Sequence, residues 1–140
     1  MIRAVAIILC LWASGSQGQT TTLSDGDRQA IQAVIADQLD AFQRDDGAAA
    51  FAQATPDIQA HFRTAANFMR MVREAYQPVY RPRQVEFRDV IDFHGAPAER
   101  VYLIGPDGVP VIALYPMERQ PDGHWRINGC YLLRVDENSV

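Results

Sequence analysis

The chain has 140 residues, a length that fits a single domain. Hydrophobic residues make up 48% of it and charged residues 21%, a balance that excludes a disordered or acidic tail protein. The chain contains no lysine, so all 13 of its Lys and Arg residues are arginines. Its formal net charge of −4 argues against a nucleic-acid partner.

The first 18 residues have the layout of a secretory signal peptide. Arg3 forms a short basic region, Ala4 to Ala13 are an apolar run, and Ser16-Gln17-Gly18 fits a small-x-small cleavage site. The run is too short to span a bilayer. We therefore expect cleavage after Gly18 and a single mature domain, residues 19–140, that is periplasmic or secreted and has no membrane attachment.

The front half of this domain predicts about four helices, two of them short. Apolar residues recur at helical spacing over residues 27–44, after N-cap candidates at 24–27. Asp46, Thr55 and Thr64 are expected to cap three further helices, of which the first two span 48–54 and 56 to about 62. The prolines at 78 and 82 predict an extended linker at Val79-Tyr80-Arg81.

The back half predicts an antiparallel meander of about four strands. Apolar and polar residues largely alternate over 85–93, and three more strands are expected at 100–105, 109–119 and 124–135, separated by Pro- and Gly-containing turns. Pro110 and Pro116 imply that the third strand is bulged or lies at an edge. The expected core side chains of the sheet are Phe87, Ile91, Val101, Leu103, Val111, Ala113, Trp125 and Ile127. Helices followed by a meander predict an α+β fold.

An ordered set of short segments carries a family resemblance. The segments are Asp27-Arg28-Gln29-Ala30-Ile31, Thr55-Pro56-Asp57-Ile58, Pro78-Val79-Tyr80-Arg81-Pro82-Arg83, Ala113-Leu114-Tyr115 and Glu118 to Cys130. With them the chain resembles the exported bacterial domain of unknown function family 4864. The ending Asp122-Gly123-His124-Trp125-Arg126-Ile127 also resembles proteins with the nuclear-transport-factor-2-like cone fold. This resemblance implies a curved sheet wrapped around a long N-terminal helix and an exported location, but no particular activity.

Asp57 and His61 are the candidate acid–base pair, since their i, i+4 spacing places both on one helix face. Relatives with the cone fold include dehydratases and isomerases, which makes an enzyme of that type one hypothesis. In the alternative interpretation, the aspartate and the histidine simply complement the dipole at the two helix ends. The three histidines show no metal-ligand spacing, so neither a metal nor another cofactor is expected.

Tyrosines and arginines provide the candidate ligand-binding residues. An apolar interior with tyrosines at its rim suits a small apolar ligand, and the alternative is a filled core. Arg81 and Arg83 flank Pro82 on a stiff segment that could bind an anion, or they could pair with the protein's own acidic helix. The predicted ligand-binding residues are Tyr76, Tyr80, Arg81, Arg83, Tyr102 and Tyr115.

Cys130 is the only cysteine left after signal cleavage, so no internal disulfide is expected. Strict alternation from Trp125 places Cys130 outside the sheet, where its thiol could serve a redox role or join a dimer. A bulge at Gly129 would reverse the phase and bury Cys130 with Leu132 as an inert thiol.

These observations favour a non-catalytic module that binds a small apolar or anionic ligand or a protein partner. Two other hypotheses remain. One is the dehydratase- or isomerase-type enzyme, and the other is a structural homodimer joined through the outer face of the sheet.

Overall fold

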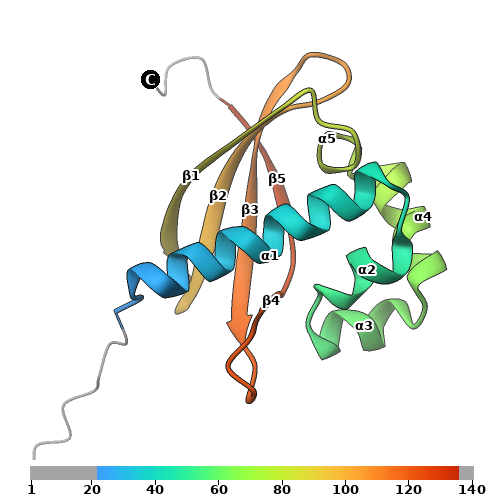
Figure 1. Cartoon of the computed structure of the whole chain (residues 1–140). Coiled ribbons are helices and arrows are strands. Elements are labelled where there is room, and N and C mark those ends of the chain that lie inside the picture. Colours follow the sequence, from blue (N-terminus) through green and yellow to red (C-terminus); the bar gives the residue numbers. More distant parts are fainter. Residues whose placement is uncertain (1–21, 136–140) are drawn as a thin grey trace, which may run out of the picture.

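The computed structural model describes residues 22–135 of the chain. The predicted signal segment therefore lies outside the described residues. In the described part, helices precede a curved antiparallel sheet, which confirms the α+β class (Figure 1). The sheet is not closed. None of the helices within residues 22–135 has the length and apolar character needed to cross a bilayer.

The long helix α1, Asp25–Gln43, crosses the concave face of the sheet (Figure 1). It begins with a capping box in which Ser24 and Asp27 satisfy each other's backbone N–H groups. Its apolar stripe is buried against the sheet and the short helices because these side chains recur at helical spacing. The buried apolar residues of α1 are Ile31, Ile35, Leu39, Ala41 and Phe42.

Four shorter helices gather around the C-terminal end of α1 (Figure 1). They are α2 (Gly47–Ala52), α3 (Pro56–Phe62), α4 (Ala65–Ala75) and α5 (Gln77–Tyr80). Asp46, Thr55 and Thr64 cap the first three of these helices, as predicted. The expectation of an extended linker at Val79-Tyr80-Arg81 was wrong, because Pro78 falls in the first turn of α5, where its missing N–H costs nothing.

The turn between α3 and α4 holds an unusual backbone conformation. Arg63 has φ 71° and ψ −43°, and the N–H of Thr64 donates to the carbonyl of Phe62 at 2.9 Å. This i to i+2 bond around a positive φ is a γ-turn of the rare, strained kind. Helix α3 itself has no buried residue.

The sheet contains five strands: β1 (Gln84–Phe93), β2 (Ala96–Ile104), β3 (Pro110–Arg119), β4 (Trp125–Ile127) and β5 (Tyr131–Arg134). Its order is β1-β2-β3-β4. Strand β5 also pairs with β3, over residues 111–114, whereas β4 pairs with residues 117–119. One extra residue in β1 shifts its register with β2 between Phe87 and Val90. After the shift Val90 lies opposite Glu99 on the concave face. Ile91 lies opposite Ala98 on the other face. The expectation that Ile91 lines the core was therefore wrong, because one extra residue reverses the alternation.

Strand β3 is central, and its register with β2 is unbroken. The expectation of a bulged or edge strand around its prolines was therefore wrong. Pro110 is the first residue of β3, where no ladder bond is needed. Pro116 lies between the part of β3 that pairs with β5 and the part that pairs with β4, opposite the break between those two strands. There the carbonyl of Pro116 accepts from the N–H of Asn128 at 2.8 Å.

The predicted last strand is divided into β4 and β5 at Gly129. Gly129 has φ 145°, a conformation that a side chain rarely permits. After this break the side chains of Cys130 and Leu132 pack against the core, whereas Tyr131 and Leu133 are exposed. The structure therefore agrees with the alternative in which an irregularity at Gly129 turns the Cys130 side chain toward the core.

The core lies between α1, the short helices and the concave face. Apart from Ile91, the expected core positions of the sheet are buried or packed against the core. In addition to the buried residues of α1, the short helices contribute Ala50, Phe68, Met69, Val72 and Val79 to this core.

Candidate functional site

A pocket of about 490 Å³ opens into the core between α3, α4 and the break from β4 to β5. We call it the interior pocket. Its lining is mainly apolar and aromatic and, among the described residues, includes no arginine, aspartate or glutamate. The lining residues are Gln38, Phe42, Ala54, Ile58, His61, Phe62, Phe68, Met71, Val72, Tyr76, Val79, Tyr115, Ile127, Asn128, Gly129, Cys130 and Tyr131.

Three uncharged polar side chains of the pocket lining are buried or half-buried. The amide of Gln38 donates to the carbonyl of Ala50 at 3.1 Å, and the hydroxyl of Tyr76 donates to the carbonyl of Cys130 at 3.1 Å. Tyr115 is only 1% exposed, and its hydroxyl has no hydrogen-bond partner among the described residues. An unpartnered buried hydroxyl is costly, and among the buried side-chain N and O atoms of the lining within residues 22–135 this hydroxyl is the one without a partner.

Cys130 contributes a neutral thiol to the pocket. Burial raises the pKa of this thiol to about 12, although the nearby Tyr115 lowers it in part. Burial, with a further contribution from Cys130, also raises the pKa of Tyr115 well above its ordinary value. Both groups therefore stay protonated at neutral pH, which does not favour thiolate chemistry at Cys130.

The structure brings four of the sequence-predicted residues to this pocket: Tyr76, Tyr115, Cys130 and His61. His61 is exposed, and its ring packs edge-on against Phe62 with the ring centres 4.8 Å apart. Asp57 is exposed on α3, does not line the pocket, and makes no hydrogen bond to His61 in the described chain.

Tyr80 and Arg81 lie at the C-terminal end of α1 instead. The guanidinium of Arg81 donates to the carbonyl of Phe42 at 2.6 Å and to the carboxylate of Asp45 at 2.9 Å. It also lies 3.9 Å from the centre of the Tyr80 ring, and the Tyr80 hydroxyl donates to Asp45. That hydrogen bond, with the charge of Arg81, holds the pKa of Asp45 below its ordinary value.

Arg83 and Tyr102 lie away from the interior pocket. The side chain of Arg83 is exposed, and its backbone N–H donates to the carbonyl of Ile104 at 2.8 Å. Tyr102 lies on the face of β2 opposite to the core residues Val101 and Leu103, with the Arg88 guanidinium 4.9 Å from its ring centre.

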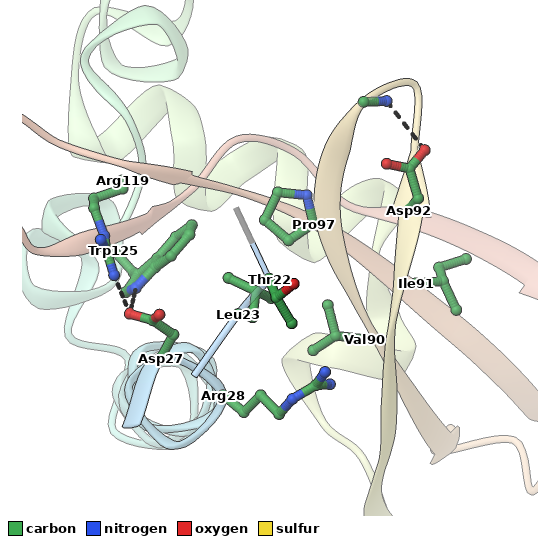
Figure 2. Close-up of a pocket in the computed structure, with 11 residues that line it drawn as sticks. Thr22, Leu23, Asp27, Arg28, Val90, Ile91, Asp92, Pro97, Arg119 and Trp125 are labelled. Carbon is green, nitrogen blue, oxygen red and sulfur yellow. Dashed lines mark hydrogen bonds and ion pairs between the residues drawn. The ribbon is translucent and has the colours of Figure 1, made fainter. Parts of the chain in front are cut away.

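A second, more open pocket of about 750 Å³ lies between the start of α1 and the β1–β2 hairpin (Figure 2). Arg28, Val90, Pro97 and Trp125 are among its lining residues. Sequence reasoning missed this pocket because α1 and β1 meet there only in the folded chain.

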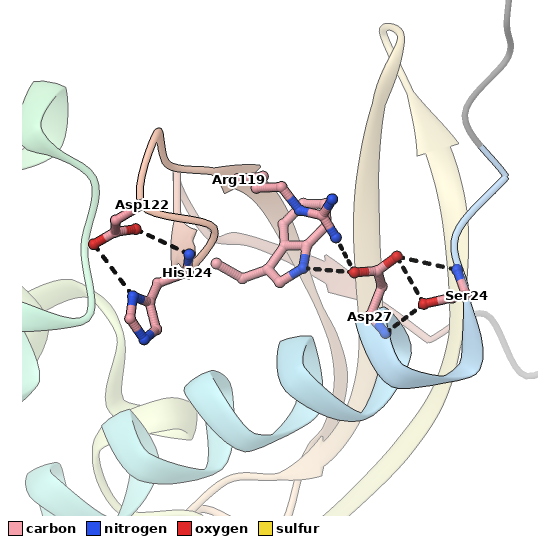
Figure 3. Close-up of polar contacts among 6 residues, drawn as sticks. Ser24, Asp27, Arg119, Asp122 and His124 are labelled. Atoms are coloured by element: carbon pink, nitrogen blue, oxygen red, sulfur yellow. Dashed lines mark hydrogen bonds and ion pairs between the residues drawn. The ribbon is translucent and has the colours of Figure 1, made fainter.

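Asp27 fixes one wall of this second pocket (Figure 3). One carboxylate oxygen accepts from Arg119 and from the indole N–H of Trp125 at 3.3 Å, and the other accepts from Ser24. Hydrogen bonds from Ser24, then from Trp125, and the Arg119 charge hold the pKa of Asp27 below its ordinary value. Because Arg119 lies on β3 and Trp125 on β4, Asp27 ties α1 to the sheet.

Figure 3 also shows Asp122 and His124 in the turn between β3 and β4. Asp122 accepts from the backbone N–H of His124 at 2.9 Å and lies 3.2 Å from its ring nitrogen. These hydrogen bonds hold the pKa of Asp122 below its ordinary value. The His124 side chain is 82% exposed, so the pair stabilises the turn.

Glu99 is a buried carboxyl group that sequence reasoning also missed. It is fully buried, one oxygen accepts from Gln32 at 3.5 Å, and the other has no partner among the described residues. Burial raises the pKa of this carboxyl group, and nearby Asp89 raises it further, whereas Gln32 and Arg28 lower it. The alternation along the strand that places Val101 and Leu103 on the core face also places Glu99 there. The sequence pattern therefore predicts a buried Glu99.

A groove of about 340 Å³ lies along α4 beside the end of α3, and His61 and Phe62 line both this groove and the interior pocket. Within residues 22–135, no three His, Cys, Asp or Glu side chains cluster in a way that could hold a metal ion.

Comparison with known proteins gives one match. A family model described as a domain of unknown function, DUF4864, matches residues 24–140. No curated protein and no solved structure shows a significant match to the chain.

Proposed function

The chain belongs to the DUF4864 family of domains of unknown function, and we propose that it is a binding module whose interior pocket holds a small, uncharged, mainly apolar ligand. The observation that carries this proposal is the pocket itself. A concave, largely aromatic site with a few polar groups is the usual form of a small-molecule site.

The charges around the pocket support an uncharged ligand. The described lining contains no aspartate, glutamate or arginine, and its one histidine, His61, is exposed. An ion placed there would lose its hydration without gaining a charged partner. An anion-binding role for Arg81 is less well supported, since its guanidinium already binds Phe42 and Asp45.

The geometry supports binding over turnover. General acid–base chemistry needs a positioned acid and base beside the substrate. Asp57 is outside the pocket lining, and the Cys130 thiol is neutral. The proposal also includes export, supported by the signal-like first 18 residues, and a nuclear-transport-factor-2-like cone, supported by the curved sheet around α1.

The test uses Nile red, an uncharged apolar dye whose fluorescence rises in apolar surroundings. Ile58 is half-buried on α3 and lines the pocket, so Ile58→Trp should fill its mouth. Ala60→Trp is the matched control, because Ala60 lies on the same helix but is exposed and outside the lining.

We expect Nile red to bind the wild type and Ala60→Trp equally, and Ile58→Trp at least about tenfold more weakly. Dye titration with circular dichroism on each variant makes the measurement. Equal binding to all three folded proteins, or no binding to the wild type, would contradict the proposal.

A further inference from the structure

The unpartnered Tyr115 hydroxyl gives the interior pocket a chemical preference. Tyr115 lies near the middle of β3, directly opposite Glu99 of β2, and lines the pocket. The other polar groups nearby are committed, since Gln38 donates to Ala50 and Tyr76 donates to Cys130. The O–H of Tyr115 is thus a donor without an acceptor among the described residues.

The immediate neighbour of this hydroxyl is the Cys130 side chain, which affects the pKa of Tyr115. A thiol is a weak hydrogen-bond acceptor, so it does not satisfy the phenol. The hydroxyl is closed to solvent in this conformation, so a bound molecule would reach it only after the Cys130 side chain turns about the single torsion between its backbone and its sulfur.

We infer that the interior pocket selects uncharged ligands that present a carbonyl-type acceptor oxygen to the Tyr115 hydroxyl; this inference rests on the proposed function. The apolar lining takes the hydrocarbon body of the ligand, and the acceptor oxygen satisfies the buried hydroxyl that has no partner among the described lining residues. A carboxylate is a poorer ligand, because the described lining supplies no arginine to offset its desolvation.

The experiment compares two molecules of nearly the same shape, 1-indanone and indane, which differ by one ketone oxygen. Each is titrated into wild-type protein, Tyr115→Phe and Tyr102→Phe, and displacement of Nile red gives the affinity. Tyr102→Phe is the matched control, since Tyr102 lies on the face of β2 opposite to the core and does not line the pocket.

We expect the wild type and Tyr102→Phe to bind 1-indanone about five- to tenfold more tightly than indane, the effect of one net hydrogen bond. Tyr115→Phe should bind the two molecules equally. The infrared carbonyl band of 1-indanone bound to the wild type should shift to lower frequency than that of the same ketone in an apolar solvent. This second measurement needs no variant.

Three results would overturn the inference: equal affinity of the wild type for both molecules, a ketone preference that survives Tyr115→Phe, or an unshifted carbonyl band. In each case, indane binding that Ile58→Trp removes would still support the proposed function. Failure of both molecules to bind the wild type would count against both.

Discussion

Glu99 is a carboxyl group buried in the core without an ion-pair partner among the described residues. It is fully buried, its only hydrogen bond within residues 22–135 comes from Gln32, and burial raises its pKa. The folded protein therefore holds the proton of Glu99 at pH values where the unfolded chain releases it. This difference lowers the free energy of unfolding as the pH rises above the ordinary pKa of 4.5.

Glu99→Gln should remove that loss of stability because an amide does not ionise. We expect the variant and the wild type to be similar at pH 4, and the variant to be more stable at pH 8. The two should diverge by at most about 1.4 kcal/mol per pH unit. Urea denaturation from pH 4 to pH 8 measures the difference. Parallel curves for the two proteins would show that folding does not shift the pKa of Glu99.

The Cys130 thiol gives a second prediction at the scale of one residue. Its pKa of about 12 lies well above the ordinary 9.0, so at pH 8 the thiolate is roughly a thousandfold rarer in the folded protein than in the unfolded chain. Iodoacetamide should therefore alkylate Cys130 more slowly by a similar factor in buffer than in urea. Cys10→Ser in the background leaves Cys130 as the reacting thiol. Similar rates in buffer and urea would restore the redox or dimer hypothesis.

At the scale of elements, the cap of α3 also joins two parts of the chain. The Thr55 side chain accepts from the N–H of Ile58 at 3.4 Å and donates to the side-chain carbonyl of Asn128 at 2.9 Å. Thr55→Ala removes both bonds and should lower the free energy of unfolding by about 1–2 kcal/mol. Thr55→Ser keeps the hydroxyl and should cost less than half of that. Chemical denaturation of both variants tests this, and equal losses would mean that the threonine methyl group matters instead.

Local rules predicted the elements well where the sequence itself sets them. The caps at Asp46, Thr55 and Thr64 satisfy neighbouring backbone groups, so their positions follow from nearby residues alone. The errors arose where a single residue changes the outcome. The register shift after Phe87 moved Ile91 off the core face, and the sequence marks it only by the two consecutive polar residues Arg88 and Asp89.

The site was predicted only in part, for a related reason. Tyr76, Tyr115 and Cys130 were singled out, and all three line the interior pocket. That Arg81 binds Asp45 and Phe42 follows from how α1 and α5 pack, which spacing along the chain does not reveal. That the Tyr115 hydroxyl has no partner within residues 22–135 is likewise a property of the packed interior.

At the scale of the whole molecule, the remaining prediction concerns export. The basic Arg3, the apolar run and the small residues up to Gly18 predict a leader that is removed. Mass spectrometry of fractionated bacterial cells should find a periplasmic chain that starts near Gln19. A cytoplasmic chain that keeps Met1 would contradict the prediction.

Helix α3 has a consequence for the kinetics of the molecule. It has no buried residue, ends at the strained turn of Arg63, and lines both the interior pocket and the groove along α4. A helix without a buried residue is expected to open in local fluctuations that leave the rest of the core intact, and its backbone amides should exchange with solvent hydrogen sooner than those of α1. The frequency of those openings, rather than global unfolding, would then set how fast molecules enter and leave the interior.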